Sequence, residues 1–159
     1  MSEFLSAKEY LARGDKHYYA GRPNEAIPDY TQAIFLMPED ATAYTKRGCA
    51  YIDTDQYPRA IADLGEAIRL NAQNWLAYHY LGLAYYRLKD EARAIVNFEK
   101  AIHHHPHDMP SYIYWALIYV GKRDYAGAIA IYDRALQINP DEKMIHAVKT
   151  LAMRKLAEG

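Results

Sequence analysis

The chain repeats itself with a period of 34 residues, and this period constrains the fold more than any other feature. A period of about 20–50 residues is typical of solenoids and other stacked-repeat proteins. Seven aligned series over four periods exclude coincidence. The seven series are Gly14, Gly48, Gly82 and Ala116; Ala26, Ala60, Ala94 and Ala128; Ala33, Ala67, Ala101 and Ala135; Tyr10, Tyr44, Tyr78 and Tyr112; His17, Tyr51, Tyr85 and Tyr119; Tyr30, Leu64, Phe98 and Tyr132; and Pro38, Ala72, Pro106 and Pro140.

The spacing inside one period predicts two helices. In the third repeat Tyr78, Gly82 and Tyr85 are spaced to share one helical face. A second such face begins at Ala94, nine residues after Tyr85, with Phe98 at its centre. Glycine inside a helix costs about 1 kcal/mol relative to alanine. Its recurrence therefore indicates that the two helices approach each other closely at the glycine, with Gly48 and Ala60 as an example.

These residues resemble the tetratricopeptide repeat (TPR) family, which has the same period and the same order of aromatic, glycine, tyrosine, alanine, aromatic, alanine and proline. The resemblance implies an all-α fold, a right-handed superhelix of antiparallel helix pairs. It predicts a single domain over residues 1–159. The expected parts are repeats at 7–40, 41–74, 75–108 and 109–142, and a capping helix at 143–159.

The sequence departs from the family pattern at a few positions. Arg13 and Arg47 replace the usual leucine of the first helix. Pro28 lies early in the second helix of the first repeat, where it removes a backbone hydrogen bond, so we expect a local kink or a late start. Polar residues two positions after the repeat-closing Pro38, Ala72 and Pro106 are placed to cap the next first helix. These expected caps are Asp40, Asn74 and Asp108.

The predicted binding site follows from the family. In TPR proteins, positions 2, 5, 9, 12 and 13 of each repeat tend to line the concave groove, and position 6 contributes at its margin. In the first two repeats these positions give a mixed surface that also includes Lys8, Tyr19, Thr42 and Asp53. The predicted groove residues are Leu11, Asp15, Tyr18, Thr45, Cys49, Ile52, Leu76, His79, Tyr80, Leu83, Tyr86, Arg87, Ile113, Tyr114 and Leu117.

The groove positions of the last two repeats are largely apolar and aromatic. The first helices expected at 75–86 and 112–120 are therefore apolar around most of their circumference. Such a helix either is fully covered by neighbouring repeats or presents a partner site. We expect a partner site, because a solenoid leaves its concave face open. The expected partner is a protein or peptide with apolar or aromatic side chains.

A well-known TPR site, the carboxylate clamp for chaperone C-terminal tails, is absent. It requires lysine, arginine and asparagine at five groove positions. Here those positions hold Leu11, Asp15, Lys46, Leu76 and Tyr80. Shifting the frame by one repeat does not restore the clamp. This set of side chains cannot grip a carboxylate with fixed cationic donors.

Other functions find little support in the sequence. Nineteen Lys and Arg nearly balance twenty Asp and Glu, which argues against nucleic acid as a partner. No stretch of about 18 apolar residues is present, so we expect no membrane insertion. The glycines form no nucleotide-binding motif, and Cys49 has no base nearby in sequence, so we expect no enzyme and no cofactor. The histidine run at 103–107 is interrupted by Pro106, and we interpret it as a solvated helix end rather than a metal site.

The sequence therefore predicts a protein-interaction module, an adaptor or chaperone-like protein that holds a peptide or helix of a partner in its groove. The alternative is a self-associating scaffold, a possible homo-oligomer, whose groove is filled by a neighbouring copy. The polar N-terminus, with Glu3, Lys8 and Glu9, and the single cysteine favour a cytoplasmic protein.

Overall fold

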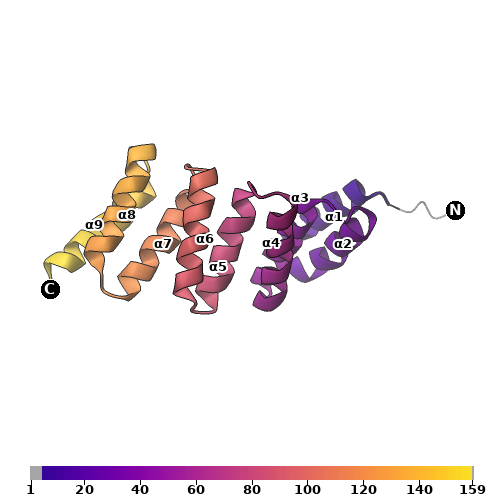
Figure 1. Cartoon of the computed structure of the whole chain (residues 1–159), viewed down its shortest axis with the longest axis horizontal. Helices are drawn as coiled ribbons and strands as arrows, with labels where there is room; N and C mark the ends of the chain where they lie inside the picture. The colour runs from indigo at the N-terminus through magenta and orange to yellow at the C-terminus, as the bar shows by residue number, and fades with distance from the viewer. Residues whose placement is uncertain (1–4, 159) are drawn as a thin grey trace.

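The computed structural model describes residues 5–158, and within this range the chain forms nine helices and no strand (Figure 1). The helices stack along one long axis, with α1 and α2 at one end and α9 at the other. None of the helices in this range is long and apolar enough to cross a membrane. The helices are α1 (Ala7–Tyr19), α2 (Pro23–Leu36), α3 (Ala41–Asp53), α4 (Tyr57–Leu70), α5 (Trp75–Arg87), α6 (Glu91–His104), α7 (Met109–Gly121), α8 (Tyr125–Ile138) and α9 (Lys143–Ala157).

The expected all-α solenoid of antiparallel helix pairs is confirmed. Helices α1, α3, α5 and α7 are the first helices of the four repeats, and α2, α4, α6 and α8 are the second helices. Helix α9 begins at Lys143, 34 residues after the start of α7 at Met109. It therefore begins where the first helix of a fifth repeat would begin.

The recurring glycines lie where the paired helices touch, as expected. A Cβ atom on Gly82 would lie 2.7 Å from the Phe98 ring, and one on Gly48 would lie 2.8 Å from Leu64. The contact is thus with the large residue of the second helix, while Ala60 contributes its carbonyl oxygen at 3.5 Å from the Gly48 site. A large side chain can fill the core only where the facing residue on the paired helix has a small side chain or no side chain.

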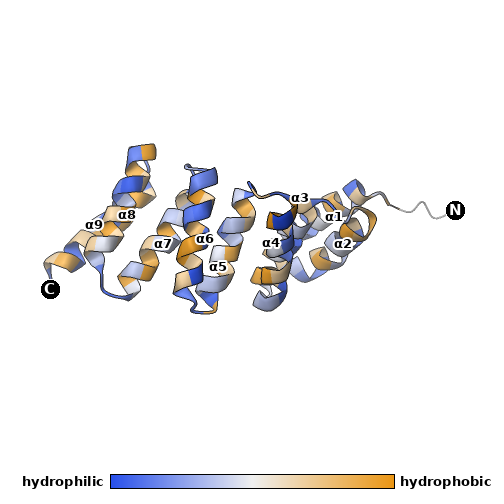
Figure 2. Ribbon diagram, viewed as in Figure 1, coloured by the Kyte–Doolittle hydropathy of each residue, from blue (hydrophilic) through white to orange (hydrophobic). Residues whose placement is uncertain are grey.

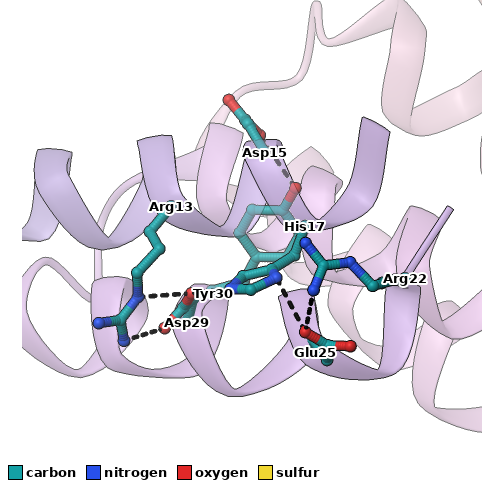
Figure 3. Close-up of polar contacts among 7 residues, drawn as sticks. All are labelled: Arg13, Asp15, His17, Arg22, Glu25, Asp29 and Tyr30. Atoms are coloured by element: carbon teal, nitrogen blue, oxygen red, sulfur yellow. Dashed lines mark hydrogen bonds and ion pairs between the residues drawn. The ribbon is translucent and has the colours of Figure 1, made fainter. Parts of the chain in front are cut away.

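The two arginines that depart from the family pattern are paired with buried aspartates. Arg13 donates two hydrogen bonds to the Asp29 carboxylate, and Figure 3 shows this pair beside the second helix. Arg47 binds Asp63 in the same way, with N···O distances of 2.7 and 2.8 Å. Each aspartate lies 16 residues after its arginine. The same two positions in the later repeats hold an uncharged pair, Leu81 with Asn97 and Trp115 with Ile131.

This covariation between repeats leads to a prediction. Arg47→Leu should cost about 1–3 kcal/mol of unfolding free energy, because it leaves the Asp63 carboxylate largely buried without its donors. Adding Asp63→Asn creates the Leu–Asn combination of the third repeat and should recover most of that loss. Urea denaturation followed by circular dichroism measures both values. A double variant as unstable as Arg47→Leu alone would contradict this account.

The two expectations about helix ends have different outcomes. Helix α2 begins at Pro23 and continues through Pro28 to Leu36, so the late start considered for it is wrong. The caps at Asp40 and Asn74 are confirmed, since their side chains accept hydrogen bonds from the amides of Thr42 and Ala77. The prediction of a side-chain cap at Asp108 is wrong. The Asp108 side chain makes no capping bond and instead contacts Ser111 and His79.

Helix α9 covers the apolar end of the fourth repeat. Ile145 and Ala152 are buried in the same cluster as Ile118 and Tyr132. The side of α9 on which a further second helix would pack is exposed and carries polar residues such as Thr150. This arrangement fits the capping role expected for the helix.

Candidate functional site

A pocket of about 220 Å³ opens on the face formed by the first helices α1, α3 and α5. We call it the Tyr18 pocket. Three repeats contribute to it, so it exists only in the stacked solenoid. It is lined by Asp15, Tyr18, Tyr19, Tyr30, Thr42, Thr45, Lys46, Cys49, Leu76 and Tyr80.

The charged groups of the Tyr18 pocket neutralise each other. The Lys46 ammonium lies 2.8 and 2.9 Å from the two carboxylate oxygens of Asp15. The Tyr30 hydroxyl donates to the same carboxylate at 2.9 Å, a contact drawn in Figure 3. Lys46 is therefore already paired, and the pocket offers an ionic ligand no unpaired counter-charge.

Two phenols and the thiol of the pocket are held in their protonated forms. Burial, together with a 2.5 Å hydrogen bond to Asp53, raises the pKa of the Tyr18 phenol far above its usual value. Burial likewise raises the pKa of the Tyr80 phenol and of the Cys49 thiol. A thiol that is buried and protonated is a poor nucleophile. The pocket is accordingly suited to holding a side chain rather than to covalent chemistry.

Comparisons with known families agree with the repeat pattern. Family descriptions of the tetratricopeptide repeat match residues 11–51, 75–108 and 110–142, and a TPR repeat description matches residues 48–89. A crystal structure of MamA is 31% identical, covers 82% of this chain and 77% of its own, and superposes with a TM-score of 0.76. The chain belongs to the tetratricopeptide repeat family.

Other solved TPR structures are similar over most of the chain. The second TPR domain of human RPAP3, solved with the HSP70 peptide SGPTIEEVD, is 25% identical with a TM-score of 0.67 and covers 70% of this chain and 93% of its own. The TPR domain of Arabidopsis OM64 is 25% identical with a TM-score of 0.68, and covers 69% of this chain and 90% of its own. A search of curated proteins finds no sequence that matches this chain.

Six of the predicted groove residues come together in the Tyr18 pocket of this TPR protein. Two further groove positions, Tyr19 and Thr42, also line it. Sequence reasoning missed Tyr30 as a pocket residue, because its ring is core and only its hydroxyl reaches Asp15. The six predicted residues are Asp15, Tyr18, Thr45, Cys49, Leu76 and Tyr80.

Two predicted groove residues are used to hold consecutive repeats together. The Thr45 hydroxyl accepts a 2.9 Å hydrogen bond from the Asn74 side chain, at the start of the next first helix. His79 occupies the same repeat position one period later, and its Nδ1 lies 2.8 Å from the Ser111 hydroxyl and 3.2 Å from Asp108. His79 is buried, so its predicted place on an open groove surface is wrong.

The expectation that Leu83 lies on an open surface is also wrong. Its exposed fraction is 8%, and it belongs to a buried cluster against which Tyr86 and Tyr114 pack. Ile52 is buried in the same cluster. Leu117, at the repeat position of Leu83 one period later, remains 36% exposed.

The remaining predicted residues are divided between packing and surface. The ring centroids of Tyr86 and Tyr114 lie 5.6 Å apart. The Tyr114 ring also stacks on Phe98, with 5.9 Å between the centroids. Leu11 and Ile113 are half-buried, whereas Arg87 is exposed. The apolar half of the predicted groove is thus in large part inter-repeat packing.

The histidine run at 103–107 has a structural role that the sequence analysis missed. His105 stacks on Trp75 with a distance of 4.4 Å between the ring centroids, and His104 stacks on Tyr78 with 5.6 Å between the centroids. The predicted antiparallel pairing of the two helices could have revealed these contacts, because it places the end of α6 beside the start of α5. Over residues 5–158 no group of three or more His, Cys, Asp or Glu side chains is arranged to hold a metal ion.

Proposed function

We propose that this TPR protein is a protein-interaction module that holds a peptide or helical segment of a partner on its first-helix face, as a cytoplasmic adaptor or chaperone-like protein. The Tyr18 pocket carries the proposal, because it is a concave site built from three successive repeats. A pocket of about 220 Å³ suits a single large side chain. That side chain would anchor the bound segment, as buried anchors do at other protein interfaces.

The chemistry of the pocket favours an apolar or aromatic anchor. The Lys46 charge is taken by Asp15, and Leu11 and Leu76 stand where a carboxylate clamp requires cations. Four tyrosines line the pocket, and their rings give it apolar and aromatic contact area. Peptide binding by the RPAP3 domain supports a peptide as the ligand class. The anchor that we propose here differs from an acidic tail.

Selection from a displayed library of random peptides tests this function. The wild type should enrich peptides that share an apolar or aromatic residue. Leu76→Lys should weaken the binding of those peptides by about tenfold or more, because it places a charge inside the pocket. Fluorescence anisotropy with an enriched, labelled peptide measures the loss.

The matched control is Leu88→Lys, which changes an exposed leucine of the same repeat outside the pocket. It should bind like the wild type, and circular dichroism should show that both variants keep their helices. Equal binding by Leu76→Lys would exclude the Tyr18 pocket. Enriched peptides defined only by acidic C-termini would contradict the proposed anchor.

A further inference from the structure

An exposed apolar run lies near the N-terminal end of the solenoid, where α2 ends. Phe35, Leu36, Met37 and Pro38 are all exposed, and Phe35 has an exposed fraction of 79%. Three or more consecutive exposed apolar residues are unfavourable in a soluble protein unless they serve a function. The other repeats place polar residues where Phe35 stands. Those residues are Arg69, His103 and Gln137.

A hollow of about 520 Å³ lies between α8 and α9 at the opposite end. Its apolar lining includes Met153 and Leu156, which are half exposed. Figure 2 shows hydrophobic residues along both helices at this end. The complete lining is Ile129, Asp133, Lys149, Met153, Leu156 and Ala157.

The first repeat and the last helix carry opposite net charge. The first repeat, residues 7–40, contains four Lys or Arg and six Asp or Glu. Residues 143–159 contain four Lys or Arg and only one carboxylate side chain, Glu158. Glu39 follows the apolar run and is exposed, while Arg154 is exposed on α9. Complementary charge steers two surfaces together and fixes their orientation.

We propose that these two surfaces bind each other in different copies of the chain. The apolar run at 35–38 of one copy docks into the hollow between α8 and α9 of the next, with the acidic first repeat facing the basic α9. One molecule cannot make this contact with itself, because the two surfaces lie at opposite ends of the solenoid (Figure 1). The contact is heterologous, so it produces open head-to-tail chains or closed rings. Neither surface shares a residue with the Tyr18 pocket, and the contact does not depend on the proposed peptide binding.

The oligomeric state of the full chain tests the proposal. Sedimentation velocity should show a mass that rises with protein concentration and falls at high salt, because the ends attract partly by charge. Phe35→Lys and Met153→Lys should each weaken self-association by about tenfold or more. Both changed residues are exposed in the free chain, so neither variant should lose helicity.

Mixing the two variants gives the sharpest result. Phe35→Lys retains an intact hollow, and Met153→Lys retains an intact apolar run. The mixture should therefore form a one-to-one dimer that neither variant forms alone. His103→Lys, at the repeat position of Phe35, and Leu151→Lys, another exposed apolar residue of α9, should associate like the wild type.

Three outcomes would overturn the proposal. The first is a wild type that remains monomeric at every concentration, which would leave these surfaces to a different partner. Alternatively, the two variants associate as strongly as the wild type. Finally, the mixture of variants forms no dimer although each variant keeps its circular dichroism spectrum.

Discussion

Leu83→Lys should lose more than about 3 kcal/mol of unfolding free energy, because it buries a charge with no partner. Leu117→Lys makes the same change at the same repeat position and should stay within about 0.5 kcal/mol of the wild type. The difference follows from their exposed fractions, 8% for Leu83 and 36% for Leu117. Urea denaturation monitored by circular dichroism measures both variants.

Leu83→Met serves as the control for this pair. It conserves volume and polarity and should cost less than about 1.5 kcal/mol. If Leu83→Lys is as stable as Leu117→Lys, the side chain at position 83 reaches solvent. The groove would then extend over the third repeat, as the sequence analysis expected.

The fold was predictable because one local environment recurs in every repeat. Small residues at positions such as Gly48 and Gly82 face a large residue of the paired helix, and a 34-residue period repeats that contact. The start of α9, in the same register, follows from the same rule. Local pattern and global architecture agree at these positions, which is why the sequence alone is sufficient.

The candidate site was less predictable, because exposure at a groove position depends on the following repeat. Tyr114 packs against the cluster that holds Leu83. One repeat later, the position that corresponds to Tyr114 holds Val148, which has a smaller side chain. Leu117, which corresponds to Leu83, stays partly exposed there. Repeat position alone assigns both leucines to the groove. Only the size of the neighbouring side chain separates them.

Long-range polar pairs were missed for a related reason. Lys46 and Asp15 are 31 residues apart, and their contact requires α1 and α3 to be adjacent across a repeat boundary. The sequence analysis placed Asp15 in the groove and considered Lys46 only as a position of the carboxylate clamp, so the two charges were treated separately. Their pairing agrees with the expected apolar or aromatic ligand, because it neutralises the Lys46 cation that lines the pocket.

Deleting residues 143–159 should lower the melting temperature and cause aggregation. Ile145 is fully buried and packs with Tyr132 and Ile118, so the truncation exposes the apolar end of the fourth repeat. In the full-length chain Ile145→Ala should already cost about 2–5 kcal/mol, because it leaves a cavity in this cluster. For a domain of this size each kcal/mol lowers the melting temperature by about 2–4 °C. Thermal denaturation and light scattering measure the two effects.

The neighbouring residue provides a matched control. Met144 is exposed on the same helical turn, so Met144→Ala should shift the unfolding free energy by no more than about 0.5 kcal/mol. A truncated chain that stays monomeric and melts like the wild type would show that α9 does not stabilise the fourth repeat. If Ile145→Ala and Met144→Ala cost the same, α9 does not bury the face that carries Ile145. Loss of stability at Ile145 alone would show that α9 acts as the fifth first helix of the solenoid, since the same helical face is buried at Ala77 of α5 and Ser111 of α7.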